Sequence, residues 1–522
     1  MRSPGGRLTV TSKPKPKPAK AKPAKAKPAK AKPKPTKPAK PITASTKVSP
    51  AKSAAATLHM LRRTTYGLTP ALVAGVPPAK QSAWLAAQLA PSTIPDAACT
   101  ALVARFTGLD WPISKVRSES DAGRINSWDV MTNLGMAAVV RAVWSQRQLL
   151  EVMVDFWSNL LNITCPSSEV WDNRCRFDAD VIRRNAFGRY ADLLLAATSH
   201  PSMLTYLNNA NSTKDNPNEN LGRELLELHS VGVDAGYSED DVQASARILT
   251  GLSIDWKTGE FTYRPDTHHV GPVKVMGFQH ANSAADGRPV VAAYTAYLAR
   301  HPATARRICH RLAVRFVRDD PPAALVQRLA AVYLAKDTAI TPVLQALFGS
   351  PEFAASADAK VRTPYESLVA AIRALGLTPP TSGIEQLKEL YWMLGDLGHQ
   401  PLAWPQPNGY PDVAAAWQST AGTLGRWNAN LNLAGDWWPK GFGRPPLTSL
   451  VPTPRPATHG ALVTALGATL RSRPVTAAER DAVCTFLGVS ASTAVHADSE
   501  VLNWRLPYVV ALLLDAPSQL LR

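Results

Sequence analysis

The apolar residues of this chain recur with the spacing of a helix face from about residue 53 to its end. Long stretches rich in Ala, Leu and Arg, such as 138–162, 178–198 and 412–434, repeat apolar side chains every three to four positions. Clusters of Pro, Gly and Asn separate these stretches. The pattern predicts a mainly α protein in which one large multi-helix body spans residues 53–522.

Two segments depart from the helical pattern. Residues 252–278 contain two β-prone runs around a turn at 257–259, which predicts a small β-hairpin. Residues 398–412 (GHQPLAWPQPNGYPD) hold too many Pro and Gly residues for a helix and are predicted to form a long loop. No fixed-period repeat and no domain boundary is visible within the helical body.

The first 52 residues differ from the rest in charge. They contain 14 Lys, two Arg and no Asp or Glu, and so carry +16 of the formal net charge of +18. Interleaved Pro and Lys leave nothing apolar to bury, which predicts a disordered, extended basic tail. Such a tail is either a charged spacer or a tether to an anionic polymer, namely nucleic acid or an envelope polymer, or to anionic lipid. The remaining 42 basic and 40 acidic residues nearly cancel.

The compartment is left open by the sequence. No run of 18 apolar residues occurs, so no transmembrane segment is predicted. The N-terminus lacks the apolar core of a classical signal peptide, so the protein is cytoplasmic, is exported by another route, or starts elsewhere. Cys165 and Cys175 bracket a short loop and could form a disulfide in an oxidising compartment, whereas in the cytosol they would be free thiols.

Several motifs carry a resemblance to a known family. LHMLRRTTYGLTP (58–70), NPNENLGRELLELHSVGV (216–233) and LGHQPLAWPQPNGYPD (397–412) resemble the bacterial domain-of-unknown-function family 1800, in its actinobacterial form, over roughly residues 55–435. The resemblance implies a mainly helical, commonly exported protein that often accompanies a sulfatase- or alkaline phosphatase-like protein. It identifies neither an established activity nor a cofactor, so both are unknown from the sequence. Where the family often has His, this chain has Ser158 or Leu160, which puts a role for those histidines in doubt here.

The first candidate catalytic groups are Glu224 and Glu227. In a helix, Leu221 and Leu228 define an apolar stripe that also contains Glu224, and a carboxylate in such a place must be paired, hydrogen-bonded or protonated. Glu227 lies three residues further on, so the two carboxyl groups can converge as an acid/base pair.

Both carboxylates also have a structural interpretation. Glu227 is four residues after Arg223, the spacing of a helical ion pair. Glu224 is then held by an arginine such as Arg183 or Arg247, without any role in chemistry.

A second candidate group consists of histidines near the predicted hairpin. The group consists of His229, His268, His269 and His280. His268 and His269 are adjacent, and neighbours in an extended segment point to opposite sides, so only one of these two is expected to face a site. No HExxH, HxH or similarly spaced ligand motif is present, so no metal site is predicted. The alternative is a histidine that only caps or packs.

The predicted loop supplies candidate substrate-binding residues. A proline-stiffened loop can present flat aromatic rings and polar groups to a sugar or a peptide, although the same aromatic rings can instead seal the core. The candidates are Trp404, Asn408, Tyr410 and Asp412.

Three functions remain in competition. No Walker A sequence, GxGxxG after a strand or GxSxG elbow occurs, which disfavours nucleotide hydrolysis, dinucleotide redox and esterase chemistry of the familiar kinds. The favoured function is an envelope-associated hydrolase that uses the buried carboxylate pair Glu224 and Glu227, with a histidine to position the substrate. The alternatives are a non-catalytic scaffold for the phosphatase- or sulfatase-like protein, and polyanion binding through the basic tail.

Overall fold

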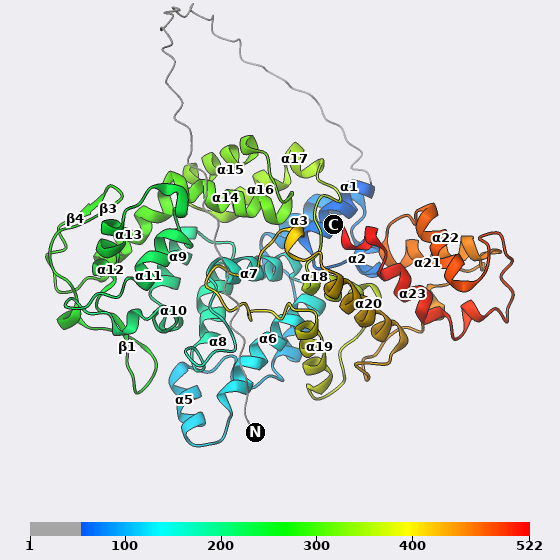
Figure 1. The fold of residues 1–522 in the computed structure, drawn as a ribbon, viewed down its shortest axis with the longest axis horizontal. Coiled ribbons are helices and arrows are strands. Elements are labelled where there is room, and N and C mark those ends of the chain that lie inside the picture. The colour runs from blue at the N-terminus through cyan, green and yellow to red at the C-terminus, as the bar shows by residue number, and fades with distance from the viewer. Residues whose placement is uncertain (1–53) are drawn as a thin grey trace, which may run out of the picture. The chain divides into compact units, whose positions relative to one another are not determined.

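The computed structural model describes residues 54–522, which belong to one compact unit. The basic tail predicted over 1–52 lies outside the described residues. Within residues 54–522 the chain forms 23 α-helices and only four short strands, so the prediction of a mainly α fold is confirmed (Figure 1).

The helices follow one another with short connections. The first eight are α1 (Ala54–Thr64), α2 (Pro70–Gly75), α3 (Gln81–Gln88), α4 (Ala97–Val103), α5 (Ile113–Asp121), α6 (Ser127–Trp144), α7 (Gln148–Leu160) and α8 (Arg174–Arg176). The next eight are α9 (Tyr190–Thr198), α10 (Pro201–Tyr206), α11 (Glu219–Glu227), α12 (Glu239–Leu249), α13 (Arg288–Arg300), α14 (Pro302–Phe316), α15 (Ala323–Ala335) and α16 (Ile340–Phe348). The last seven are α17 (Pro351–Ala354), α18 (Pro364–Ala374), α19 (Glu385–Asp396), α20 (Thr420–Gly435), α21 (His459–Arg471), α22 (Ala477–Leu487) and α23 (Leu506–Leu514).

Side-chain caps explain where several helices begin. Ser238 and Asp241 form a reciprocal capping box at the start of α12, as do Thr363 and Glu366 at α18. At α11 the capping residue is Asn218, whose side chain accepts a hydrogen bond from the Asn220 amide. The helix therefore starts at Glu219, two residues after Pro217.

Two β-hairpins stand where one was predicted. β1 (Leu252–Ile254) pairs with β2 (Phe261–Tyr263) across the expected turn. β3 (Val273–Val275), inside the predicted range 252–278, pairs with β4 (Phe278–His280), which begins at the last residue of that range. The second turn is Met276-Gly277, and both residues have positive φ. Methionine rarely adopts this conformation, so the sequence carries no ordinary turn signal there.

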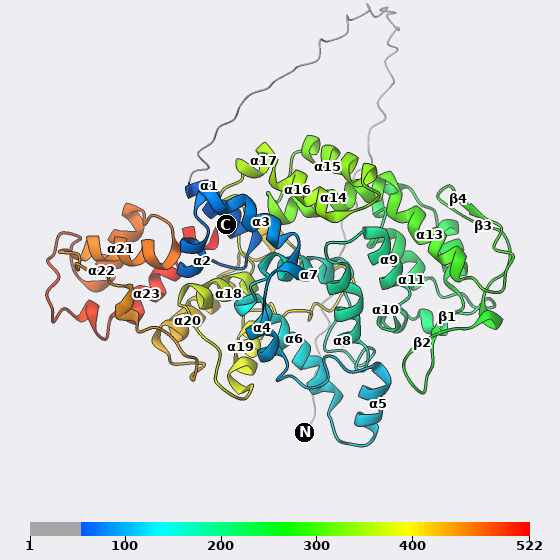
Figure 2. The same cartoon turned by 180° about the vertical axis from the view of Figure 1, so that it is seen from behind.

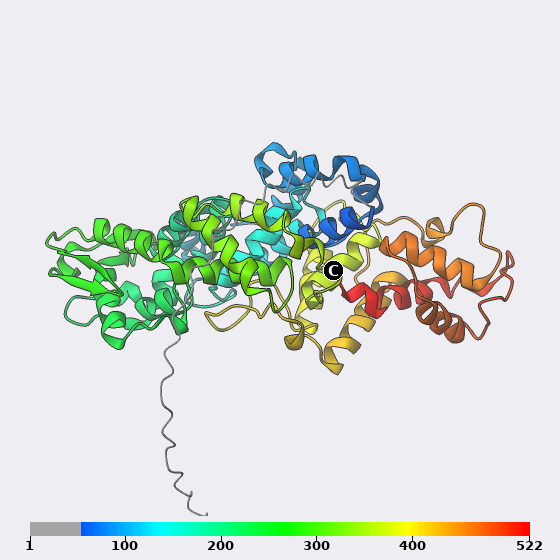
Figure 3. The same cartoon turned by 90° about the horizontal axis from the view of Figure 1, so that it is seen from above.

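The packing places α7 in the interior. Figure 2 shows α1 and α3 beside α7, and α6 also packs on it. In Figure 3 the two hairpins lie at one end of the described residues and helices α21, α22 and α23 at the other. The predicted loop after α19 has no regular structure over 398–412, and it reaches the end of α7. No helix within residues 54–522 is both long and apolar enough to cross a bilayer.

Candidate functional site

A cavity of about 270 Å³ lies between α7, α14 and the loop that follows α19. Its wall is unusually rich in charged side chains for a helical interior, and three of them are carboxylates. The polar lining residues are Asp155, Asn159, His310, Arg311, Arg315, Asp319, Thr363, His399, Tyr410 and Asp412.

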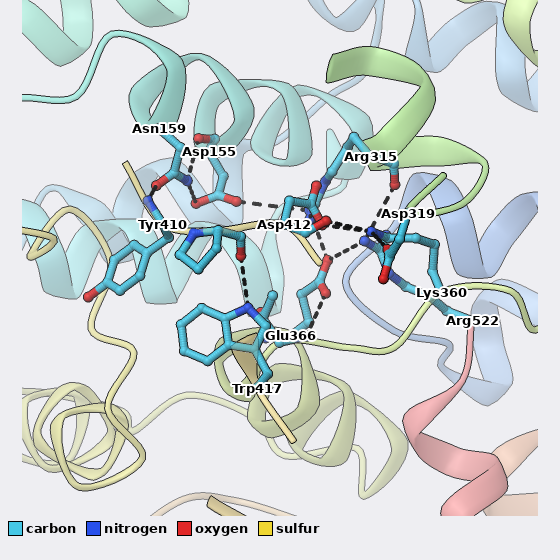
Figure 4. A network of polar contacts seen from close by, with 12 residues as sticks. Asp155, Asn159, Arg315, Asp319, Lys360, Glu366, Tyr410, Asp412, Trp417 and Arg522 are labelled. Carbon is cyan, nitrogen blue, oxygen red and sulfur yellow. Dashed lines mark hydrogen bonds and ion pairs between the residues drawn. The ribbon is translucent and has the colours of Figure 1, made fainter. Parts of the chain in front are cut away.

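Helix α7 supplies Asp155 and Asn159, one turn apart on the same face. The Asn159 amide nitrogen donates to the Asp155 backbone oxygen at 2.9 Å and to its carboxylate at 3.2 Å. The Asn159 amide oxygen accepts a hydrogen bond of 3.0 Å from the backbone N–H of Tyr410 (Figure 4). One side chain thus joins the Asp155 carboxylate to the loop.

The loop approaches α7 so closely that one position must be glycine. Gly409 has φ +70°, and a Cβ atom there would overlap the backbone oxygen of Asn159. The residues after α7 hold the loop as well, because the Asn162 side chain donates to two loop carbonyls and Thr164 donates to the carbonyl of Trp404. The loop is therefore fixed by hydrogen bonds in spite of its irregular backbone.

Aromatic rings close one side of the cavity. The His399 ring stacks on Trp417 with centroids 4.5 Å apart and an angle of 3°, and it lies 4.1 Å from the Tyr410 ring. Burial lowers the pKa of His399 to about 3, although Glu366 acts in the opposite direction. This histidine is therefore neutral at physiological pH and serves as a packed ring.

The Asp412 carboxylate is held in its charged form by two buried cations. Lys360 Nζ lies 3.1 Å from Asp412 Oδ1 and 2.5 Å from the carboxylate of Asp319, and Arg315 lies 3.7 Å from Asp412 Oδ2 (Figure 4). Burial favours the protonated acid, but Lys360 and Arg315 outweigh it and lower the pKa of Asp412 to about 2.

Arg315 is the centre of this ionic network. Its guanidinium lies 2.8 Å from Glu366, which is also 3.1 Å from the side chain of Arg522. It is 3.9 Å from the carboxylate of Asp155. Although burial opposes its charge, Glu366, Asp412 and Asp155 raise the pKa of Arg315, so it remains a cation.

The pKa of Asp155 is shifted in the opposite direction to that of Asp412. Burial raises its pKa to about 6, and the neighbouring charges of Glu366 and Asp412 add to the effect, while Arg315 and Asn159 oppose it. A carboxyl group with a pKa near neutrality can both accept and donate a proton under physiological conditions. Two of the three carboxyl groups of the cavity, Asp155 and Asp412, therefore have pKa values shifted in opposite directions, an arrangement typical of acid/base sites.

Arg311 adds a cation that forms no ion pair within residues 54–522, although the charge of Asp412 acts on it. It lies one turn before Arg315 on α14 and lines the same cavity. Within residues 54–522 it has no partner at hydrogen-bond or ion-pair distance. Burial lowers its pKa, and the positive charge of Arg307 lowers it further. A partly buried guanidinium in this state is suited to bind a carboxylate, phosphate or sulfate group.

A second, smaller network lies behind Asp155. Arg183 donates to both carboxylate oxygens of Glu151, at 3.0 and 2.7 Å, and to Asp178 at 2.8 Å. Asp178 and Arg183 belong to a π-helical segment, Phe177–Arg183, a distortion that recurs at functional sites. A cavity of about 20 Å³ separates these groups from Asp155, which lines both cavities.

The carboxylate pair Glu224 and Glu227 lies elsewhere, on α11, and lines neither of these two cavities. Glu224 is only partly buried, and among residues 54–522 it forms no ion pair. Burial raises its pKa, and Glu227 adds to that effect. Glu227 accepts a hydrogen bond from the Tyr237 hydroxyl at 3.1 Å. The expected ion pair of Glu227 with Arg223 is wrong, because Arg223 binds Glu219 and Glu239 instead, at 3.2 and 2.6 Å.

The second expected pairing, of Glu224 with Arg183, fails because Arg183 is bound to Glu151 and Asp178. The other arginine considered for Glu224, Arg247, forms no ion pair among residues 54–522.

The adjacent histidines point to different surroundings, as expected for an extended segment. His268 is buried, where Nδ1 lies 2.8 Å from the Thr250 carbonyl oxygen and Nε2 lies 3.0 Å from Asn282 Oδ1. His269 is partly exposed, and its pKa is lowered by burial and then by Arg247. Neither histidine lines the two cavities around Asp155. No cluster of three metal-ligating side chains occurs among residues 54–522.

The loop candidates divide into two pairs. Tyr410 and Asp412 line the main cavity, whereas Trp404 and Asn408 do not. The Trp404 indole nitrogen donates to the Asn408 side chain at 2.7 Å, and the Trp404 ring lies 5.1 Å from that of Tyr410. These two residues therefore support the loop next to the cavity.

The residues that sequence reasoning missed are Asp155, Arg311 and Arg315. Asp155 stands in the apolar run EVMVDFWSNLL, so the reasoning applied to Glu224 also singles out Asp155. The arginines carry no such signal, because α14 contains four arginines and only their packing separates them. Of the two positions where the family often has His, Ser158 lines the small cavity and Leu160 is buried in the core.

The five cysteines, Cys99, Cys165, Cys175, Cys309 and Cys484, are buried free thiols. Cys165 and Cys175 therefore do not form the disulfide that their spacing allowed.

Comparison with known proteins supports the resemblance noted in the sequence. The model of one family, described as "Protein of unknown function (DUF1800)", matches residues 59–521, so the match continues well past residue 435. Searches of curated proteins and of solved structures give no match. Because the family model covers most of the chain, the protein belongs to the DUF1800 family.

Proposed function

We propose that this protein is a hydrolase in which Asp155 is the general base and Arg311 binds a negatively charged group of the substrate. The observation that supports it is the pair of carboxyl groups, Asp155 and Asp412, whose pKa values move in opposite directions in one cavity. Separated pKa values in one site are what acid/base chemistry requires.

The chemical step follows from the positions of these groups. The Asp155 carboxylate takes a proton from a water molecule, and the resulting hydroxide attacks the acyl carbon or the phosphorus of an ester. The bond to the leaving oxygen breaks, and that oxygen receives the proton from Asp155. Arg311 stabilises the negative charge that develops on the substrate. Asp412 remains ionised, and its charge helps to hold the pKa of Asp155 near 6.

The substrate class follows from charge. Arg311 is the cavity-lining cation without an ion-pair partner among residues 54–522, so it favours an ester that carries an anionic group. The envelope as the place of action and the phosphatase- or sulfatase-like partner remain predictions from the family resemblance.

The test is a hydrolysis assay of the purified full-length protein. Its panel contains 4-nitrophenyl phosphate, bis(4-nitrophenyl) phosphate, a 4-nitrophenyl ester with a terminal carboxylate, and the neutral 4-nitrophenyl acetate. We expect turnover of an anionic member, a loss of at least about 100-fold in kcat for Asp155→Asn, and a raised KM for Arg311→Met with anionic substrates only. Glu224→Gln serves as the comparison, because it tests the carboxylate pair predicted from sequence.

Each result decides between named alternatives. If Glu224→Gln abolishes turnover and Asp155→Asn does not, the site lies on α11. If no substrate is turned over, the hydrolase proposal is rejected. The scaffold function is then favoured, because the ion pairs of Arg315 join α14, α18, the loop and Arg522 and need no catalytic role.

Polyanion binding through residues 1–52 is a separate proposal, and it depends on their charge of +16. Deleting these residues should abolish retention on DNA or on an anionic envelope polymer, and the affinity of the intact chain should fall steeply with salt. A truncated protein that binds equally well would show that the tail is only a spacer.

A further inference from the structure

A third cavity, of about 540 Å³, lies between α20, α22 and α23. Its size falls within the range of sites that enclose a small organic ligand. Its wall is almost entirely apolar, and none of its lining residues belongs to the cavity around Asp155.

Aromatic rings are concentrated around this cavity. Among residues 54–522, four of the eight strongly exposed Trp and Phe side chains are Trp427, Trp437, Phe486 and Trp504. Three of these rings surround Tyr508, with centroids 5.7 Å (Trp437), 6.3 Å (Phe486) and 6.2 Å (Trp504) away. Soluble proteins seldom leave so many large rings in contact with water unless something binds them.

The ionisable groups of the wall are acidic, apart from the Tyr508 hydroxyl. Glu479 is already neutralised, because Arg471 lies 3.2 Å from it and Ser518 and the Thr476 amide also donate to it. Asp515 differs, since its carboxylate accepts one hydrogen bond, of 2.7 Å from Asn430, and forms no ion pair within residues 54–522.

The carboxylate of Asp515 lacks an ion-pair partner within residues 54–522. The cation whose charge acts on it is Arg426, which is buried, forms no ion pair with Asp515, and donates from Nη2 to Thr423. Burial is the main influence on Asp515 and raises its pKa to about 7. An aromatic-lined cavity with one unneutralised carboxyl group is suited to a cation, because ring faces and a carboxylate both attract positive charge.

We propose that this cavity binds an organic ammonium ion with an apolar body, whose charge lies against Asp515 and the Trp427 ring. The apolar body fills the space between α22 and α23, against Phe486 and Tyr508. This proposal does not depend on the hydrolase proposal, since the two cavities share no residue.

The test compares three probes with the same apolar body by calorimetry on the full-length protein at pH 8. The probes are 4-phenylbutylamine, 4-phenylbutan-1-ol and 4-phenylbutyrate. We expect the amine to bind at least about tenfold more tightly than the alcohol. In Asp515→Asn the affinity for the amine should fall to within about twofold of the affinity for the alcohol. Trp427→Leu should lower the binding affinity for both the amine and the alcohol.

The matched controls are Asp129→Asn and Trp128→Leu, an exposed neighbouring pair on α6 that should change nothing. Equal affinity of amine and alcohol, an unchanged amine affinity in Asp515→Asn, or the absence of binding would each overturn the proposal. Near-ultraviolet circular dichroism of each variant shows whether the fold is retained. A variant that unfolds is replaced by Asp515→Ser or Trp427→Phe, for which the same expectations hold in direction.

Discussion

The raised pKa of Asp155 makes a quantitative prediction about stability and pH. The carboxyl group has a pKa of about 3.8 when exposed and about 6 in the folded protein. The folded state therefore binds this proton more tightly than the unfolded chain does, and the stability it contributes is full below pH 4 and is lost as the pH rises through 6. With about 1.4 kcal/mol for each pH unit between the two values, the loss is about 3 kcal/mol. Only 21% of the side chain is exposed, so solvent screens the effect little.

Replacing Asp155 by Asn removes this titration but keeps the shape of the side chain. The free energy of unfolding is measured by urea denaturation of the wild type and of Asp155→Asn between pH 4 and pH 8. We expect the difference between variant and wild type to shift by about 3 kcal/mol in favour of the variant over this range. Asp129→Asn, an exposed carboxylate on α6, should show no such shift.

A difference that stays constant with pH would refute the reasoning, because Asp155 would then titrate at its ordinary value. A shift in the opposite direction would show that the ion pair with Arg315, at 3.9 Å, outweighs burial. Asp155 would in that case be a structural anion, and the general base proposed above would have to be another group.

Further predictions concern the network, the loop and the sequence-derived carboxylate. Lys360→Met leaves Asp319 without its cation and Asp412 with Arg315 alone, so we expect a loss of about 3–5 kcal/mol in urea denaturation, against less than about 0.5 kcal/mol for the exposed control Lys336→Met. Gly409→Ala combines a positive φ with a clash, whereas Gly398→Ala has the positive φ and open space; we expect about 1–2 kcal/mol for Gly398→Ala and a clearly larger loss of stability for Gly409→Ala. Glu224→Gln breaks no ion pair, and its cost should stay within about 1 kcal/mol; a loss of 3 kcal/mol or more in the same assay would contradict the described surroundings of Glu224.

The helical class was predictable from sequence because periodicity reports which faces are buried. The capping box of Ser238 and Asp241 shows a helix start that is set by local residue types. The second hairpin was not predictable, since Met276 adopts a left-handed conformation that its residue type disfavours. Similarly, Asn216 looks like a helix cap, yet its amide is used in a turn with Thr213.

The candidate site was only half accessible to sequence reasoning. The loop and its residues Tyr410 and Asp412 stood out through their unusual composition. Their counterparts on α7 and α14 are separated from them by some 100 to 250 positions, and periodicity cannot tell which helix faces a distant loop. The pKa of Asp155 depends on Glu366 and Arg315, so it is a property of the folded arrangement alone.

The Asn159 amide has a further consequence for how the loop and the acid communicate. Its oxygen holds the Tyr410 amide while its nitrogen donates to the Asp155 carboxylate. A displacement of the loop that turns this amide withdraws a donor from the carboxylate and so increases its proton affinity. A substitution that shifts the loop at Tyr410 would then also change the pKa of Asp155, although the two residues are 255 positions apart in the sequence.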